Sequence, residues 1–176
     1  MKSCLRLSLF AFVAGLPAAP CSAGEVGDYL TKDGKLREAV TVKTGGVEFL
    51  APPGEVWIIE PSGDWTRKST ESRGKFTARQ LAALAQHLAT QDFNSLPKAQ
   101  GYEIEGPDGV GRSHNYVVIG FGKKEAAFYT KRGESRDDYL PRPGDPKAAA
   151  WSRFIALELV LADMLHMSEA AEEQEN

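Results

Sequence analysis

The chain is 176 residues long and acidic, with 21 Lys plus Arg against 24 Asp plus Glu and a net charge of −3. A chain of this length can bury enough apolar surface for one core, so we expect one domain. The negative balance argues against nucleic acid as a partner, because a nucleic-acid binder needs a cationic face to neutralise phosphates.

Residues 1–23 have the layout of a cleavable export signal. Lys2 and Arg6 form a basic start, an apolar run from Leu7 to Leu16 follows, and small residues end the segment at Ala23. The apolar run is too short to span a bilayer, so we expect an exported protein, periplasmic or extracellular, with no transmembrane anchor. An uncleaved anchor is the alternative interpretation.

Both cysteines, Cys4 and Cys21, lie inside this segment. Removal of residues 1–23 from the 176 leaves a chain of 153 residues that contains no cysteine. This remaining chain has 19 Lys plus Arg against 24 Asp plus Glu. Although an exported domain can form disulfides, this one must be stabilised by burial alone.

The first predicted elements are strands. Residues 24–38 are polar and contain glycine, which indicates a flexible lead-in, and residues 38–43 have the composition of a strand. A hairpin is expected over 55–67, because its centre, residues 61–64, reads Pro-Ser-Gly-Asp and suits a tight turn.

A helix is predicted to begin after Thr77 and to end near Thr90. Thr77 and Gln80 have the spacing of a capping box, and Phe76 precedes the cap where a hydrophobic staple begins. The apolar residues that follow fall on one helical face, at Leu81, Leu84, Ala85 and Leu88.

A second hairpin and a second helix complete the domain. Residues 114–121 and 125–130 are rich in strand-forming residues, with a turn between them. A charged loop over 131–145 then leads to a helix that Asp145 caps, with Pro146 at its first position. Its core-facing residues recur at steps of four and three: Ala150, Phe154, Leu157, Leu161 and Met164.

Two features of this last region remain open from the sequence. Leu159 and Val160 point away from the core-facing row, so they form either a second buried edge or a small patch that faces a partner. The acidic residues 168–176 are expected to be a solvated tail. The domain itself is therefore predicted over residues 39–167.

The order of strands, helix, strands and helix predicts the α+β class. We expect an antiparallel sheet of about four or five strands with two helices packed on one face.

No catalytic, metal-binding or cofactor-binding pattern stands out. The histidines His87, His114 and His166 have no His or Cys partner at metal-ligand spacing. The glycines of 106–111 lack the strand and helix that flank a phosphate loop, and the acidic pair 137–138 lacks the further oxygens of a calcium loop. We therefore expect no metal, no cofactor and no enzymatic activity.

The aromatic residues are predicted to pack in the core rather than to stack against a ligand, since they fall on strands and at core-facing helical positions. They are Trp57, Trp65, Trp151, Phe121, Phe128 and Phe154.

From about Val40 to Ile119 the chain resembles the emfourins, small inhibitors of thermolysin-type metalloproteases. The similarity rests on a strand ending in Gly45-Gly46, the 61–64 turn, and the 74–84 segment Gly-Lys-Phe-Thr-Ala-Arg-Gln-Leu-Ala-Ala-Leu. It continues in Asp-Phe-Asn-Ser-Leu-Pro at 92–97 and in the strand up to Ile119. The resemblance implies a sheet covered by helices and a secreted metalloprotease as the partner.

The candidate partner-binding segment is the loop at the end of the first strand. Glycines allow a backbone to approach a partner closely, and large apolar side chains can fill a partner's pocket. This chain departs from the emfourin pattern here, because Val-Glu-Phe-Leu follows the two glycines in place of an aromatic-Ala-Gly run. The residues predicted to bind are Gly45, Gly46, Val47, Glu48, Phe49 and Leu50.

Two other interpretations remain. The domain is either structural or associated with the cell envelope, docking through the 133–147 loop or the acidic tail, or it is an enzyme of a type without a recognised motif. For Phe49 and Leu50 the alternative to binding a partner is that they simply close the edge of the sheet.

Overall fold

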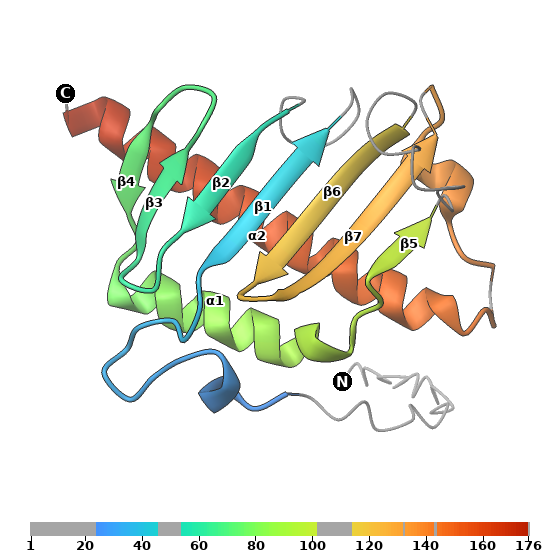
Figure 1. Cartoon of the computed structure of the whole chain (residues 1–176), viewed down its shortest axis with the longest axis horizontal. Coiled ribbons are helices and arrows are strands. Elements are labelled where there is room, and N and C mark those ends of the chain that lie inside the picture. The colour runs from blue at the N-terminus through green and yellow to red at the C-terminus, as the bar shows by residue number, and fades with distance from the viewer. Residues whose placement is uncertain (1–23, 46–53, 102–113, 132, 143, 176) are drawn as a thin grey trace, which may run out of the picture.

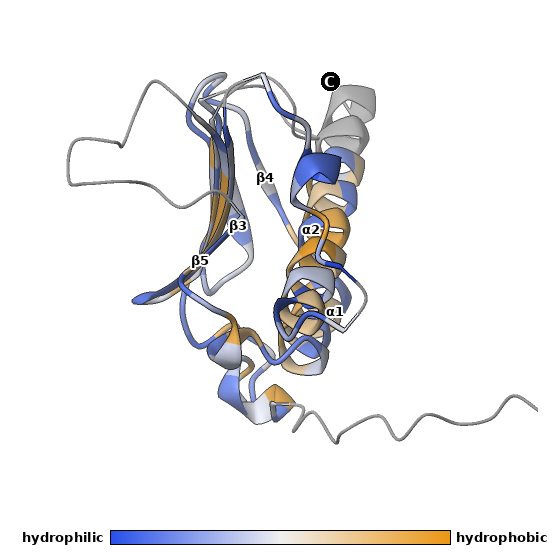
Figure 2. Ribbon diagram, turned by 90° about the vertical axis from the view of Figure 1, so that its right-hand side faces the viewer, coloured by the Kyte–Doolittle hydropathy of each residue, from blue (hydrophilic) through white to orange (hydrophobic). Residues whose placement is uncertain are grey.

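The computed structural model describes residues 24–45, 54–101, 114–131, 133–142 and 144–175. They form one seven-stranded sheet with two α-helices packed on the same face (Figures 1 and 2). The predicted α+β class is confirmed. The described residues contain no helix that is both long and apolar enough to cross a membrane.

The sheet has the strand order β4-β3-β2-β1-β6-β7-β5. Its strands are β1 (Val40–Gly45), β2 (Val56–Ile59), β3 (Asp64–Arg67), β4 (Arg73–Lys75), β5 (Ala99–Gly101), β6 (His114–Phe121) and β7 (Lys124–Lys131).

The strand count and the all-antiparallel arrangement expected from the sequence are wrong. β4 and β5, at the two edges, have three residues each, which is too short to show the alternation by which a strand is predicted. β5 pairs parallel with β7, whereas the other strand pairs are antiparallel.

The turn between β2 and β3 forms where the sequence predicts it. The Gly63 N–H donates to the Glu60 carbonyl at 2.8 Å, and Gly63 has φ +91°. A Cβ at Gly63 would lie 2.8 Å from the Phe76 carbonyl oxygen, so glycine is required by both conformation and space.

α1 (Ala78–Thr90) begins with the predicted capping box. The Gln80 N–H donates to the Thr77 hydroxyl at 3.3 Å, and the Thr77 N–H donates to the Gln80 side-chain oxygen at 2.8 Å. The predicted apolar face is confirmed, because its four residues are buried: Leu81, Leu84, Ala85 and Leu88.

α2 (Lys147–Glu175) runs behind the sheet from the β5 side to the β4 side (Figure 1). The Asp145 carboxylate accepts a hydrogen bond from the Lys147 N–H at 2.8 Å, as expected of a cap. The helix buries Phe154, Leu157, Leu161 and Leu165. Leu159 is 46% exposed, so it does not belong to a second buried edge.

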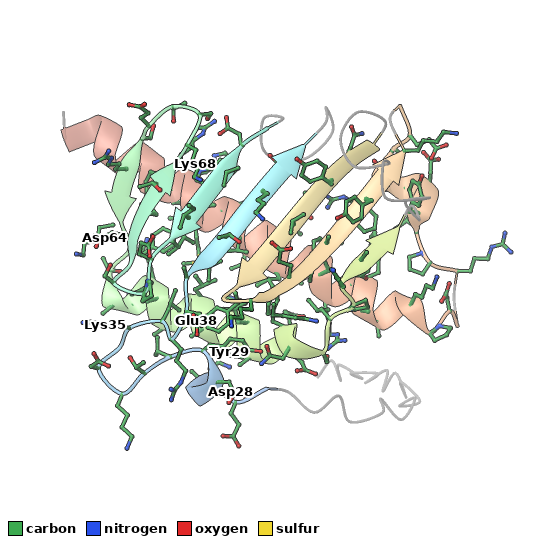
Figure 3. The ribbon with its side chains drawn as sticks, in the orientation of Figure 1. Asp28, Tyr29, Lys35, Glu38, Asp64 and Lys68 are labelled. Carbon is green, nitrogen blue, oxygen red and sulfur yellow. The ribbon has the colours of Figure 1, made fainter. Side chains whose placement is uncertain are left out.

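Residues 24–38, which the sequence indicates as a flexible lead-in, are packed against the core. Tyr29 and Leu36 are 0% and 2% exposed, and the Tyr29 ring lies 5.2 Å from that of Phe121. Figure 3 shows this region beside α1, with the exposed Asp28 projecting away from the domain. Because these two core residues stand among polar turn residues, composition alone did not predict their burial.

Most of the aromatic residues pack as predicted. Trp57, Trp65, Phe121, Phe128 and Phe154 are buried, and Trp151 is half-buried. They belong to the core or pack against it. Both α-helices lie on one side of the sheet, so its opposite face has neither described helix over it (Figure 2).

Candidate functional site

Of the six residues predicted to bind a partner, the structure describes Gly45; Gly46, Val47, Glu48, Phe49 and Leu50 lie outside the described residues. Gly45 is the last residue of β1 and pairs with Tyr116 of β6. An ideal Cβ at Gly45 would lie 2.2 Å from a ring atom of Tyr116. The Tyr116 ring therefore lies over the Gly45 backbone, and any larger residue at 45 would require that ring to move.

The two flanks of residues 46–53 are joined by backbone hydrogen bonds. The Thr44 N–H donates to the Glu55 carbonyl at 2.9 Å, and the Gly54 N–H donates to the Thr44 carbonyl at 2.8 Å. Thr44 itself is only 4% exposed. The chain thus leaves and re-enters the sheet at a hydrogen-bonded base, formed by the buried Thr44 and Glu55 and the exposed Gly54.

A buried ion pair braces this base. Arg67 donates from Nε and Nη2 to the two carboxylate oxygens of Glu55, at 3.0 and 2.9 Å, and the Ser69 hydroxyl also donates to that carboxylate. The Arg67 guanidinium lies 5.2 Å from the centre of the Trp57 ring, within cation–π range. The hydrogen bonds from Arg67 hold the pKa of Glu55 below its usual range.

The open face of the sheet beside Gly45 carries aromatic and charged side chains. The rings of Tyr116 and Tyr129 lie 6.2 Å apart, and Lys43 pairs with Glu125 at 2.8 Å. Burial raises the pKa of Tyr129, and the nearby Glu125 carboxylate adds to the effect. This face can stack against a partner and can donate or accept hydrogen bonds.

The other residues considered from the sequence do not come together. His87 is half-buried on α1 and His166 is exposed on α2, whereas His114 begins β6 and its side chain is outside the described set. Asp138 completes the capping box of a 3-10 helix that Ser135 caps, by accepting from the Ser135 N–H at 2.7 Å. The described part of the chain contains no group of three His, Cys, Asp or Glu side chains that could hold a metal.

Sequence reasoning missed Glu55 and Glu158 as buried charges. The signal for Glu55 was present in the alternation of the strand. Glu55 is two residues before the buried Trp57 and four before the buried Ile59, so its side chain points to the same face of the strand as theirs. Glu158 follows Phe154 by four residues and precedes Leu161 by three, which places it on the core-facing side of α2.

No family model matches the chain, and no curated protein matches it either.

Proposed function

We propose that this protein is an exported binding module that inhibits thermolysin-type metalloproteases through residues 45–50. The observation that carries the proposal is the hydrogen-bonded base at Thr44, Gly54 and Glu55. A segment that starts and ends on two hydrogen-bonded strands loses less conformational freedom on binding than one on a free tail. Binding loops held on a rigid scaffold are common for this reason.

Binding energy in this proposal comes from a few apolar contacts. Phe49 and Leu50 supply the large side chains of the segment, and a protease pocket that encloses them gains the free energy of burying their surface. The role is inhibition by occupation rather than catalysis, so the segment needs no catalytic group.

The emfourin resemblance supports the same function. The motifs that carry it lie on the β2–β3 turn, on α1 and on β6, which are parts of one scaffold around β1. A sheet covered by helices on one face is also what the resemblance implies.

The test is a titration of a thermolysin-type protease with the purified protein, following peptide hydrolysis. We expect activity to fall linearly to a stoichiometric end point. The double variant Phe49→Ser/Leu50→Ser should lose inhibition by at least a hundredfold, since two buried side chains of this kind each contribute roughly 1.5–3 kcal/mol.

A matched control is Leu159→Ser/Met167→Ser, which makes the same chemical change at two residues that are 46% and 72% exposed on α2. It should inhibit like the unchanged protein. If hydrolysis continues while the added protein stays intact on a gel, inhibition is excluded and the structural or envelope-associated alternative gains. If the double variant inhibits fully, the segment is the wrong site.

A further inference from the structure

A groove of about 830 Å³ lies where β5 meets the first turns of α2. One wall is β5 with Tyr129, and the other is the chain from Asp138 to Arg142. Trp151 of α2 lines it between them. Its volume falls within the range of sites that enclose a peptide side chain or a small ligand.

The far wall of the groove is fixed in place. The Tyr139 hydroxyl accepts from the Lys131 N–H at 3.0 Å and is also bonded to the Glu134 carboxylate. Arg136, in the same segment, pairs with the buried Glu158 of α2 at 2.7 Å. The groove is therefore preformed, which lowers the entropic cost of filling it.

β5 offers backbone groups to an occupant. It is the last strand of the sheet, with β7 as its one neighbouring strand among the described residues, and both Ala99 and Gly101 are exposed. Gly101 has φ +80° and departs from extended backbone, so Ala99 and Gln100 are the residues of this edge that can pair with another extended chain.

Two of the residues that line the groove, Gln100 and Trp151, carry buried donors. Gln100 Nε2 and Trp151 Nε1 are buried and have no hydrogen-bond partner within the described residues. Both atoms are enclosed by protein, so an occupant reaches them only when the Gln100 or Trp151 side chain turns toward the groove.

Charge selects the class of occupant. Arg142 and Lys147 line the groove together with Asp138 and Asp145, so its formal charge is balanced. A phosphate or a strongly acidic peptide gains little from such a site, whereas an uncharged segment meets no unmatched charge.

We propose that this groove binds an extended, uncharged peptide segment of a partner protein as an added strand on β5. A large apolar side chain of that segment packs among Tyr139, Leu140 and Trp151. This site uses none of residues 45–50, so it stands or falls independently of protease inhibition.

The test uses a capped hexapeptide, Thr-Val-Phe-Val-Thr-Gln, added to the ¹⁵N-labelled protein, with versions that carry Leu, Lys or Glu in place of Phe. We expect saturable NMR shifts at the Gln100 and Gly101 amides and at the Trp151 indole N–H with Phe and Leu, and weak or no shifts with Lys and Glu. A version with every second amide N-methylated cannot pair with a strand edge and should cause no shifts. The proposal is overturned if no peptide shifts these signals, or if the N-methylated peptide or free indole acts equally well.

A matched pair of variants locates the site. Leu140→Ser removes a groove residue that is 50% exposed, and Leu159→Ser removes one on α2 that is 46% exposed and lies outside the groove. We expect Leu140→Ser to weaken peptide binding roughly tenfold and Leu159→Ser to leave it unchanged. Equal effects of the two variants would place the peptide elsewhere and overturn the proposal.

Discussion

Two buried glutamates, one beside β2 and one on α2, each pair with an arginine, yet their pKa values shift in opposite directions. Glu55 and Glu158 have side chains that are equally exposed, at 6%, and lie 2.9 and 2.7 Å from Arg67 and Arg136. The pKa of Glu55 is lowered, mainly by its hydrogen bonds to Arg67, whereas burial raises the pKa of Glu158.

The difference lies in depth of burial as well as in hydrogen bonding: desolvation is the largest influence on the pKa of Glu158, whereas the hydrogen bonds from Arg67 outweigh it at Glu55. Both oxygens of Glu55 are bonded by Arg67, and Ser69 adds another donor. Glu158 accepts from Arg136 at Oε1, but its Oε2 has no partner among the described residues. An ion pair of good length therefore stabilises the charged form only when hydrogen bonds replace the water that burial removes.

The largest expected effect comes from removing the arginines. Arg67→Ala leaves the Glu55 charge buried with one donor and should lower the free energy of unfolding by roughly 3 kcal/mol at pH 7. Arg136→Ala should cost less, because Glu158 is already easier to protonate. Urea unfolding followed by tryptophan fluorescence measures both.

Arg67→Lys is the control for this pair, because it keeps the charge but loses the planar fork. We expect it to fall between Arg67→Ala and the unchanged protein. Equal losses from Arg67→Ala and Arg136→Ala would show that the two pairs do not differ as described.

Neutral substitutes sharpen the comparison at smaller amplitude. Glu55→Gln loses charge-assisted hydrogen bonds and should destabilise the fold by about 1–2 kcal/mol. Glu158→Gln removes a poorly solvated charge while keeping an acceptor for Arg136, so stability should change by less than about 0.5 kcal/mol or rise. Loss of stability in both variants, by similar amounts, would contradict the opposite pKa shifts.

The pH dependence separates the same two residues. Glu158 has a folded pKa above the ordinary 4.5, so the folded state binds more protons between these values and the charge costs stability at neutral pH. The deficit of the unchanged protein relative to Glu158→Gln should therefore shrink as pH falls from 7 through the folded pKa toward 4.5.

Glu55 should behave in the opposite way. Its folded pKa lies below the ordinary 4.5, so its contribution is complete above 4.5 and is lost as pH falls through the folded pKa. The advantage of the unchanged protein over Glu55→Gln should hold from pH 7 to 5 and shrink below that. Urea titrations at several pH values measure both differences, and parallel curves would contradict the assignment.

The sequence was enough to predict the elements that local chemistry determines. The capping box at Thr77 located α1, and the strand-rich run at 114–121 gave β6 its observed bounds. β5 could not be predicted in this way, since its existence depends on pairing with β7 after the chain has passed through α1. The groove beside β5 could not be predicted either, because it forms from β5, residues 138–142 and the start of α2, which are brought together by tertiary packing.

The buried ion pairs show the same limit at the level of side chains. The alternation around Trp57 and the spacing within α2 place both glutamates on core-facing sides, so their burial was within reach of a pattern argument. Arg136 was not, because it lies 22 residues before Glu158 in a loop with no periodicity. Which cation meets which carboxylate is decided by tertiary packing.

The smallest expected effect tests whether the N–O distance of an ion pair alone determines how much the pair stabilises the fold. Lys43 and Glu125 pair at 2.8 Å on the open face of the sheet, as closely as the buried pairs, but their side chains are 42% and 44% exposed. Water competes for both charges there, so Lys43→Met should change the free energy of unfolding by less than about 0.5 kcal/mol, and raising the salt to about 0.5 M should erase the difference. A loss as large as that of Arg67→Ala would mean that ion-pair geometry, rather than burial with complete hydrogen bonding, sets the strength of these pairs.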